Sequence, residues 1–186
     1  MIYAVDIETF STKSDAVVAA IGIARDDGKR WYWRLRHNVT PQGVRMAGGQ
    51  SDRRVDAPTL EWWGQAPEKA KREAFDSEGR IDHALAIMEM CIIFSRDPAT
   101  EIWARGSMDQ RVLEDMIAKT LGESHIPWPY NVWRDERTIT AALVGIETKK
   151  AEAHRADDDA AVCLHNAINC SHIIKSAVED WINAKS

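Results

Sequence analysis

The stretch Ile2-Tyr3-Ala4-Val5-Asp6-Ile7-Glu8-Thr9 runs from apolar residues into two carboxylates. Its pattern predicts a β-strand. Side chains at i and i+2 of a strand project to the same face, so we expect Asp6 and Glu8 side by side at the end of the strand, with Ile7 pointing into the core. Open α/β sheets bind ligands at such strand ends. Taken alone, the tripeptide is more typical of a polar strand end that faces water, and its place at the end of a hydrophobic first strand favours the site.

Two further strands are expected directly after the first. Residues 17–24 are β-branched and small, and residues 31–35 alternate aromatic with basic side chains. The sequence Asp26-Asp27-Gly28-Lys29 between them is typical of a tight turn and predicts a hairpin. Residues 40–56 are rich in Gly, Arg and Asp without a period, which indicates a long loop.

The remainder of the chain alternates helical patterns with two short strands. We expect helices over residues 57–75, 80–95, 109–121, 137–145 and 157–184, and strands over 101–104 and 130–133. The second of these helices carries one apolar face made of Ile81, Leu85, Met88 and Ile92. The last is expected to bury Ala160, Leu164, Ala167, Ile168, Ile174, Val178 and Trp181. This order predicts a single α/β domain over residues 1–186, with a mixed five-stranded sheet flanked by helices in the ribonuclease-H-like plan.

Composition favours a soluble, cytosolic protein. The chain has 186 residues, 45% hydrophobic and 28% charged, which is ordinary for one globular domain. Its three cysteines form no C-x-x-C pair, and we interpret Cys163 and Cys170 as small buried thiols. Asp6 interrupts the first apolar run, so no secretory signal is expected. The longest apolar stretch, residues 16–24, is far shorter than the roughly 20 residues that span a bilayer, so no membrane partner is expected.

The net charge of −5 argues against an extended protein that binds duplex nucleic acid through many phosphate contacts. A small enzyme that acts on a strand end fits this charge better. Divalent cations bound by carboxylates would offset part of the negative charge.

Three residues far from the first strand are candidates for the same site. Asp109 follows Gly106 at the start of a predicted helix, near the positive end of its dipole, where an ordinary N-cap is the alternative. His154 and Asp159 are five positions apart, so within one helix their side chains would point about 140° apart. They can share a site if His154 lies in the preceding loop and Asp159 in the first turns of the helix. The alternative is a charged helix cap with an exposed histidine.

The order of these motifs resembles the DEDDh (DnaQ-like) 3′–5′ exonuclease superfamily. Asp6-Ile7-Glu8-Thr9, an Asp after a Gly in mid-chain, and His-x4-Asp match its three motifs, and Arg155 stands where the tyrosine variant has Tyr. Thr59-Leu60-Glu61-Trp62-Trp63 and Arg134-Asp135-Glu136-Arg137-Thr138 are similar to the bacterial and phage ribonuclease-T-like exoribonuclease branch. The chain departs from the superfamily at Arg105 and Met108, where Asn and Phe are common. That departure affects the substrate inference more than the mechanism.

The resemblance implies a two-metal site. Asp6, Glu8, Asp109 and Asp159 would hold two Mg²⁺ or Mn²⁺ ions, Glu8 would also steer the water, and His154 would be the general base. Carboxylate oxygens suit such hard cations, and an imidazole can accept a proton from water at neutral pH. The products would be nucleoside 5′-monophosphates.

Substrate contacts follow less directly. The resemblance places Thr9, Phe10 and Met108 near the terminal nucleotide, although Phe10 fits the core equally well. Because Trp62 and Trp63 are adjacent on a helix, only one can be well buried, and the other would face the cleft or an interface. Arg134 and Arg137 are expected either to hold phosphate or to brace the sheet.

Several alternatives stay open at this point. Single-stranded or short RNA is the first choice of substrate, with DNA 3′ ends as the alternative. A catalytically idle module that binds nucleic acid or protein is a second reading, and a two-metal phosphatase a third. Related ribonucleases are often homodimers, and eight tryptophans are ample for an interface, but neither decides whether this chain is one. The resemblance implies a cytoplasmic protein encoded by a bacterium or phage.

Overall fold

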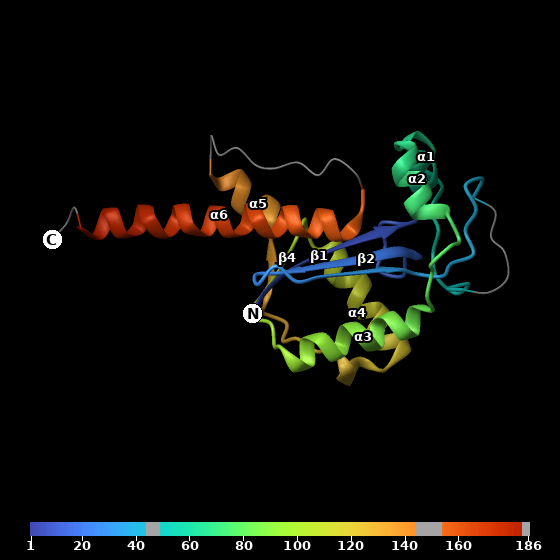
Figure 1. The fold of residues 1–186 in the computed structure, drawn as a ribbon, viewed down its shortest axis with the longest axis horizontal. Helices are drawn as coiled ribbons and strands as arrows, with labels where there is room; N and C mark the ends of the chain where they lie inside the picture. Colours follow the sequence, from blue (N-terminus) through green and yellow to red (C-terminus); the bar gives the residue numbers. More distant parts are fainter. Residues whose placement is uncertain (44–48, 144–153, 184–186) are drawn as a thin grey trace.

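A mixed five-stranded sheet forms the centre of the molecule. The computed structural model describes residues 1–43, 49–143 and 154–183 (Figure 1). The strands are β1 (Ile2–Thr9), β2 (Val18–Arg25), β3 (Arg30–Arg34), β4 (Glu101–Ala104) and β5 (Trp133–Asp135), in the order β3-β2-β1-β4-β5. The β1–β2 and β2–β3 pairs are antiparallel, whereas β4 runs parallel to both β1 and β5. The predicted α/β class and the five-stranded mixed sheet are confirmed, consistent with a ribonuclease-H-like fold.

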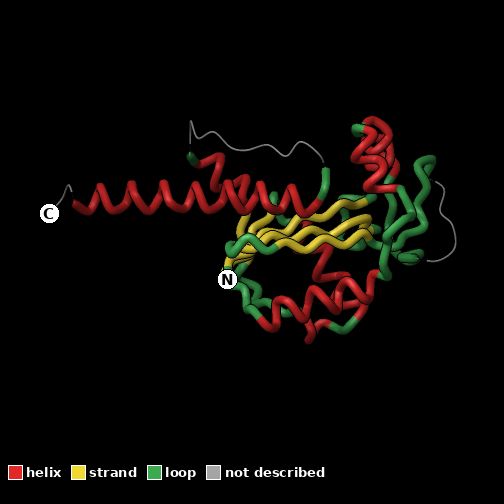
Figure 2. Tube along the Cα trace, viewed as in Figure 1, coloured by secondary structure: helices red, strands yellow, loops and turns green. Residues whose placement is uncertain are grey.

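Helices cover both faces of the sheet (Figures 1 and 2). Helices α3 (His83–Arg96) and α4 (Met108–Thr120) lie against one face. The long helix α6 (Ala156–Asn183) crosses the other face, with α5 (Glu136–Ala142) beside it. Helices α1 (Ala57–Gln65) and α2 (Glu68–Phe75) stand at the end of the sheet toward which β1 runs, and a 3₁₀ turn spans Glu123–His125.

The two faces of the sheet pack differently. On the α3 and α4 side the core is built of large side chains, among them Tyr3, Ile23, Phe94 and Met116. On the α6 side the packing residues are small, namely Ala4, Ala24, Ala160, Cys163 and Ala167, with Trp103 and Leu164 at the edge. Small residues on both elements let the helix axis approach the sheet closely.

Gly22 is the point of closest approach between α6 and the sheet. It lies on β2 directly opposite Asp6 of β1. A Cβ atom at this position would stand 2.0 Å from the carbonyl carbon of Ala156 and 2.1 Å from the backbone nitrogen of Asp157. The absence of a side chain therefore allows the first turn of α6 to rest on the strand that neighbours Asp6.

A third cluster joins α1 and α2 to the sheet. Its buried members include Phe10, Val17, Ala19, Trp63, Ala70 and Ala74. The guanidinium of Arg80 reinforces it by donating to the carbonyls of Ala19, Leu35, Glu73, Ala74 and Asp76 at 2.6–2.9 Å. One arginine thus satisfies the last carbonyls of α2 and two carbonyls of the sheet.

Element boundaries differ from the sequence prediction in three places. The helix predicted over residues 57–75 is two helices, because Pro67 lacks an N–H and Ala66 before it is extended. Strand β5 begins at Trp133, later than the predicted strand over residues 130–133. Helix α5 ends at Ala142, and residues 144 and 145 of the predicted helix lie outside the described residues.

The predicted apolar faces of two helices also need correction. In α3 the buried residues are Ala86, Ile87, Met90 and Phe94, whereas Leu85, Met88 and Ile92 are 42–48% exposed. This helix is apolar nearly all round, so periodicity does not identify its core face. In α6 the predicted face is buried only as far as Cys170, and Ile174, Val178 and Trp181 are exposed.

No helix within the described residues is long and apolar enough to cross a membrane.

Candidate metal centre and substrate cavity

Four carboxylates from three elements surround one small cavity. Asp6 and Glu8 come from β1, Asp109 from the first turn of α4, and Asp159 from the first turn of α6. They line a cavity of about 230 Å³ together with Ile7, Arg105, Met108, Arg137 and His154. The structure therefore brings together all five of the residues for which the sequence predicted metal and base roles.

Local structure explains how each carboxylate reaches the cavity. Gly106 has φ +104°, a conformation that favours glycine, and lets the chain turn from β4 into α4. One carboxylate oxygen of Asp109 accepts the backbone N–H of Ile7 at 3.1 Å, which fixes α4 against β1 between Asp6 and Glu8. Ile7 itself is buried on the opposite face, as the strand alternation predicts.

His154 lies in the loop before α6, and Asp159 lies in the helix, as their spacing requires for a shared site. One ligand atom each from Glu8, His154 and Asp159 lies within 4.8 Å of the others. The Oδ1 atom of Asp159 is buried and accepts no hydrogen bond from the described residues. An unsatisfied buried carboxylate oxygen is costly, and a bound cation would remove that cost.

The electrostatics of the cavity favour a cation. Burial, followed by the neighbouring carboxylates, raises the pKa of Asp6 and of Glu8 well above their usual values. Burial raises the pKa of Asp109 to about 6 and also raises that of Asp159. These carboxyl groups resist ionisation together, because like charges are held close in a poorly solvated place. Divalent cations would reverse this balance, so the residues present fit a magnesium or manganese centre.

Two arginines, Arg105 and Arg137, also line this cavity. The sequence indicated Arg137 for phosphate or for bracing the sheet, whereas Arg105 was noted only as a departure from the superfamily motif. Arg105 places its Nε 3.6 Å from the buried carboxylate of Glu136, which also accepts the side-chain amide of Asn166 at 3.0 Å. Arg105 lowers the pKa of Asp6 and Asp159 by its charge. Arg137 acts in the same direction on Asp109.

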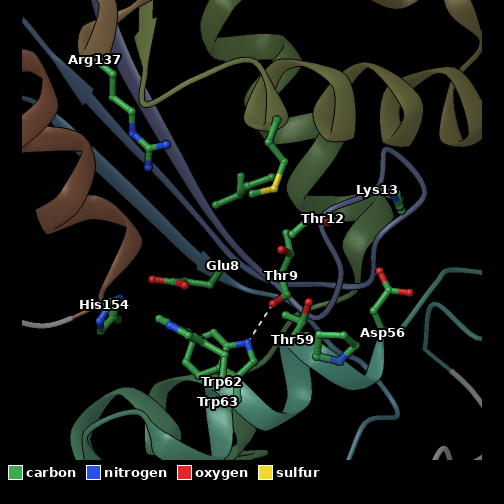
Figure 3. A pocket seen from close by; sticks show the side chains of 13 residues that line it. Glu8, Thr9, Thr12, Lys13, Asp56, Thr59, Trp62, Trp63, Arg137 and His154 are labelled. Atoms are coloured by element: carbon green, nitrogen blue, oxygen red, sulfur yellow. Dashed lines mark hydrogen bonds between the residues drawn. The ribbon is translucent and has the colours of Figure 1, made fainter. Parts of the chain in front are cut away.

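A larger cavity of about 830 Å³ opens beside the carboxylates (Figure 3). Five residues line both cavities, so the two share a wall: Ile7, Glu8, Met108, Arg137 and His154. The larger one is otherwise lined by Thr9, Thr12, Lys13, Asp56, Pro58, Thr59, Trp62 and Trp63. This cavity combines apolar walls with hydroxyl groups and the amine of Lys13. The sequence analysis had not singled out Lys13.

The two adjacent tryptophans have different environments. Trp63 is 1% exposed, and its indole N–H donates to the carbonyl of Thr9 at 2.8 Å. Trp62 is 47% exposed and meets the ring of His154 edge-on, with centroids 5.1 Å apart and planes at 88°. The prediction that only one of them is well buried is confirmed, and the other faces the cavity (Figure 3).

The other predicted substrate residues divide into two groups. Thr9 and Met108 line the larger cavity. Phe10 does not, because it is fully buried against His37, Trp63 and Phe75. Arg134 donates to the carbonyls of Asn131 and Trp133 and braces the loop before β5, whereas Arg137 lines both cavities.

Comparison with models of known protein families gives a match over most of the chain. A family model described as the 3'-5' exoribonuclease Rv2179c-like domain matches residues 1–178. No protein with a curated description matches the chain. The match covers all four carboxylates and His154.

Proposed function

Because the chain belongs to the Rv2179c-like family of 3'-5' exoribonuclease domains, we propose that it shortens single-stranded or short RNA from the 3′ end by two-metal hydrolysis at the carboxylate cavity. The observation that carries the proposal is the convergence of Asp6, Glu8, Asp109 and Asp159 on one cavity, with His154 at its rim. Enzymes of this family are 3'-5' exonucleases; the metal ions, the base and the substrate contacts are the parts proposed.

The carboxylates would hold two divalent ions, Mg²⁺ or Mn²⁺. When bound, such a pair stabilises the attacking and leaving oxygens of an in-line displacement at phosphorus. Asp6 on β1 and Asp109 on α4 would supply carboxylate oxygens to the two ions. Asp159 supplies an oxygen that accepts no hydrogen bond from the described residues, which suits a ligand.

His154 would take a proton from the attacking water. Its ring lies within reach of Glu8 and Asp159, so a water held between these groups can donate to the imidazole. Glu8 would orient the same water through its second oxygen. The edge contact with Trp62 limits rotation of the His154 ring and keeps it facing the cavity.

The larger cavity is the place for the nucleotides at the 3′ end. The exposed face of Trp62 and the side chain of Met108 offer an apolar surface on which a base can stack, worth about 1–3 kcal/mol per base. Arg137, which lines both cavities, can pair with the phosphate next to the bond that breaks. The hydroxyls of Thr12 and Thr59 can donate to or accept from sugar hydroxyls, and that of Thr9, which donates to the carbonyl of Ser11, can still accept; such contacts support RNA as the first choice.

An end-labelled oligonucleotide assay tests the reaction. With Mg²⁺ or Mn²⁺ the chain should release 5′-monophosphates stepwise from the 3′ end, and a chelator should stop it. Matched RNA and DNA oligomers of the same sequence compare the two substrates. Equal degradation in chelator, or products that carry 3′-phosphates, would contradict the mechanism.

Two variants test the assigned roles. His154→Ala should lower kcat about 10²–10⁴-fold with little change in Mg²⁺ binding, because it removes the base and leaves the carboxylates. Asp159→Asn should lower both activity and metal binding. His165→Ala and Asp158→Asn, at exposed positions of α6, are the matched controls and should retain activity. Full activity of His154→Ala would contradict its role as the base. A wild-type chain that binds RNA but does not degrade it in the presence of Mg²⁺ or Mn²⁺ would favour the interaction-module alternative.

A further inference from the structure

The last part of α6 extends beyond the body of the molecule. The buried residues of this helix end at Cys170, and every residue over 171–183 is exposed. At 1.5 Å per residue this segment, which we call the α6 extension, is roughly 20 Å long. Figures 1 and 2 show it projecting past the ends of the strands, on the side of the N-terminus.

The α6 extension continues the core-facing stripe of its own helix. Cys163 and Ala167, four positions apart, pack on the sheet, and Cys170, three positions further on, is fully buried. The same spacing leads on to Ile174, Val178 and Trp181, which are 39%, 51% and 60% exposed. Spacings of three and four keep residues on one side of an α-helix. The stripe that is covered by the sheet in the first half of α6 therefore faces solvent in the second half.

Charged residues on the α6 extension are arranged to complement a second copy. Lys175 and Glu179 follow Ile174 and Val178 by one position and lie on the same flank of the stripe. When two such helices run antiparallel about a twofold axis near residue 177, the same flanks face each other, so Lys175 of each lies opposite Glu179 of the other. The same register sets Ile174 against Val178 and Trp181 across the axis. In a parallel pair, opposite flanks of the two helices would face each other, so Lys175 and Glu179 of the two copies would not meet.

We propose that the α6 extension pairs antiparallel with the α6 extension of a second copy of this chain, forming a homodimer. The apolar stripe supplies the burial, and the two Lys175–Glu179 pairs set the register and direction. This interface goes beyond the proposed reaction and does not depend on it.

Helix α3 carries another exposed apolar surface among the described residues. Leu85, Met88 and Ile92 are exposed on this helix, and Met88 and Ile92 border a groove of about 520 Å³. Arg96 lines this groove, and no acidic residue lines it. It therefore lacks the self-complementary charges of the α6 extension, and it serves as the comparison surface in the test.

Sedimentation velocity on the whole chain over a hundredfold range of concentration is the direct test. The wild type should reach twice the 21.0 kDa mass of one chain. Val178→Glu should remain at the mass of one chain, because it places a charge in the middle of the stripe. Met88→Glu, an equally exposed apolar residue on α3, should still dimerise. Circular dichroism and exonuclease activity should match the wild type in both variants, since both sites lie away from the carboxylate cavity.

Charge reversal tests the register. Lys175→Glu and Glu179→Lys should each weaken self-association about tenfold, since each creates two like-charge pairs. An equal mixture of the two variants should associate more tightly than either alone, because every pair is then opposite in charge. A wild type that stays at the mass of one chain at all concentrations overturns the proposal. So does a dimer that Val178→Glu leaves intact and Met88→Glu dissociates.

Discussion

Asp109 shows what the cavity demands of a single side chain. It is 5% exposed, and burial raises its pKa from 3.8 to about 6. Its contact with the N–H of Ile7 needs only an oxygen acceptor, not a charge. The ionised carboxylate of Asp109 therefore destabilises the fold when no metal is bound.

This cost predicts how metal-free stability depends on pH. A carboxyl whose pKa is higher in the folded state binds more protons there, so its stabilising contribution is complete below pH 4 and is lost as the pH rises to about 6. Asp109→Asn should raise the free energy of unfolding in chelator at pH 7 by on the order of 1–3 kcal/mol, with a smaller gain at pH 4.5. Urea unfolding at the two pH values measures this.

The same variant should lose most of the stabilisation that Mg²⁺ gives the wild type. Asp180→Asn, exposed on α6, should behave as the wild type in both respects. An Asp109→Asn protein that is no more stable than the wild type at pH 7 in chelator would show that the ionised carboxylate costs nothing.

The positive charge of Arg105 offsets part of the negative charge of the cavity carboxylates. It lies between the carboxylates of the cavity and the buried Glu136. Arg105→Gln should destabilise the metal-free chain by about 2 kcal/mol, because Glu136 and the four carboxylates lose a cation. The loss should be smaller at saturating Mg²⁺, since the ions then supply positive charge.

Thermal unfolding with Mg²⁺ and with chelator distinguishes these two losses. Arg134→Gln is the matched control, because Arg134 is exposed and donates to nearby carbonyls of the loop. Equal destabilisation of Arg105→Gln in both conditions would mean that Arg105 braces Glu136 and has no electrostatic link to the cavity.

At the scale of elements, the contact between α6 and β2 decides where Asp159 lies. A side chain at Gly22 would overlap the backbone of Ala156 and Asp157. Gly22→Ala should therefore destabilise the fold by about 3 kcal/mol. It should also lower kcat by at least tenfold in the fraction that folds, because small displacements of a catalytic ligand are costly.

Gly64 offers the matched control for that substitution. It is a helical glycine of α1 with open space around its Cβ position. Gly64→Ala should be neutral or stabilise the chain by up to about 1 kcal/mol. Stability and kcat of each variant are read from urea unfolding and the oligonucleotide assay. Wild-type values for Gly22→Ala would exclude the close approach.

Over the whole molecule, the features that the sequence predicts well are those set by strand alternation and by the spacing of residues within a motif. The i and i+2 carboxylates of β1 and the five-residue spacing of His154 and Asp159 translate directly into positions at one cavity. Strand β4 was predicted with its observed bounds, because its four residues are enclosed by clear breaks. These features depend on neighbours in the chain.

What the sequence did not predict depends on distant partners. Nothing near Arg105 indicates that it meets Glu136, and nothing near Arg80 indicates that it collects carbonyls from α2 and two strands. The split between α1 and α2 was encoded in Pro67 and could have been predicted. The exposed stripe of the α6 extension has the same period as the buried one, since periodicity identifies a face of a helix but not what covers it.

The length of α6 fixes a distance in the paired molecule. Asp159 stands near one end of this rigid rod and the proposed twofold axis near residue 177, about 27 Å along the helix. The two carboxylate cavities of such a dimer would then lie about 54 Å apart along the paired helices, at opposite ends of the assembly. Each cavity would bind its own RNA 3′ end, so the dimer would join two sites that act independently.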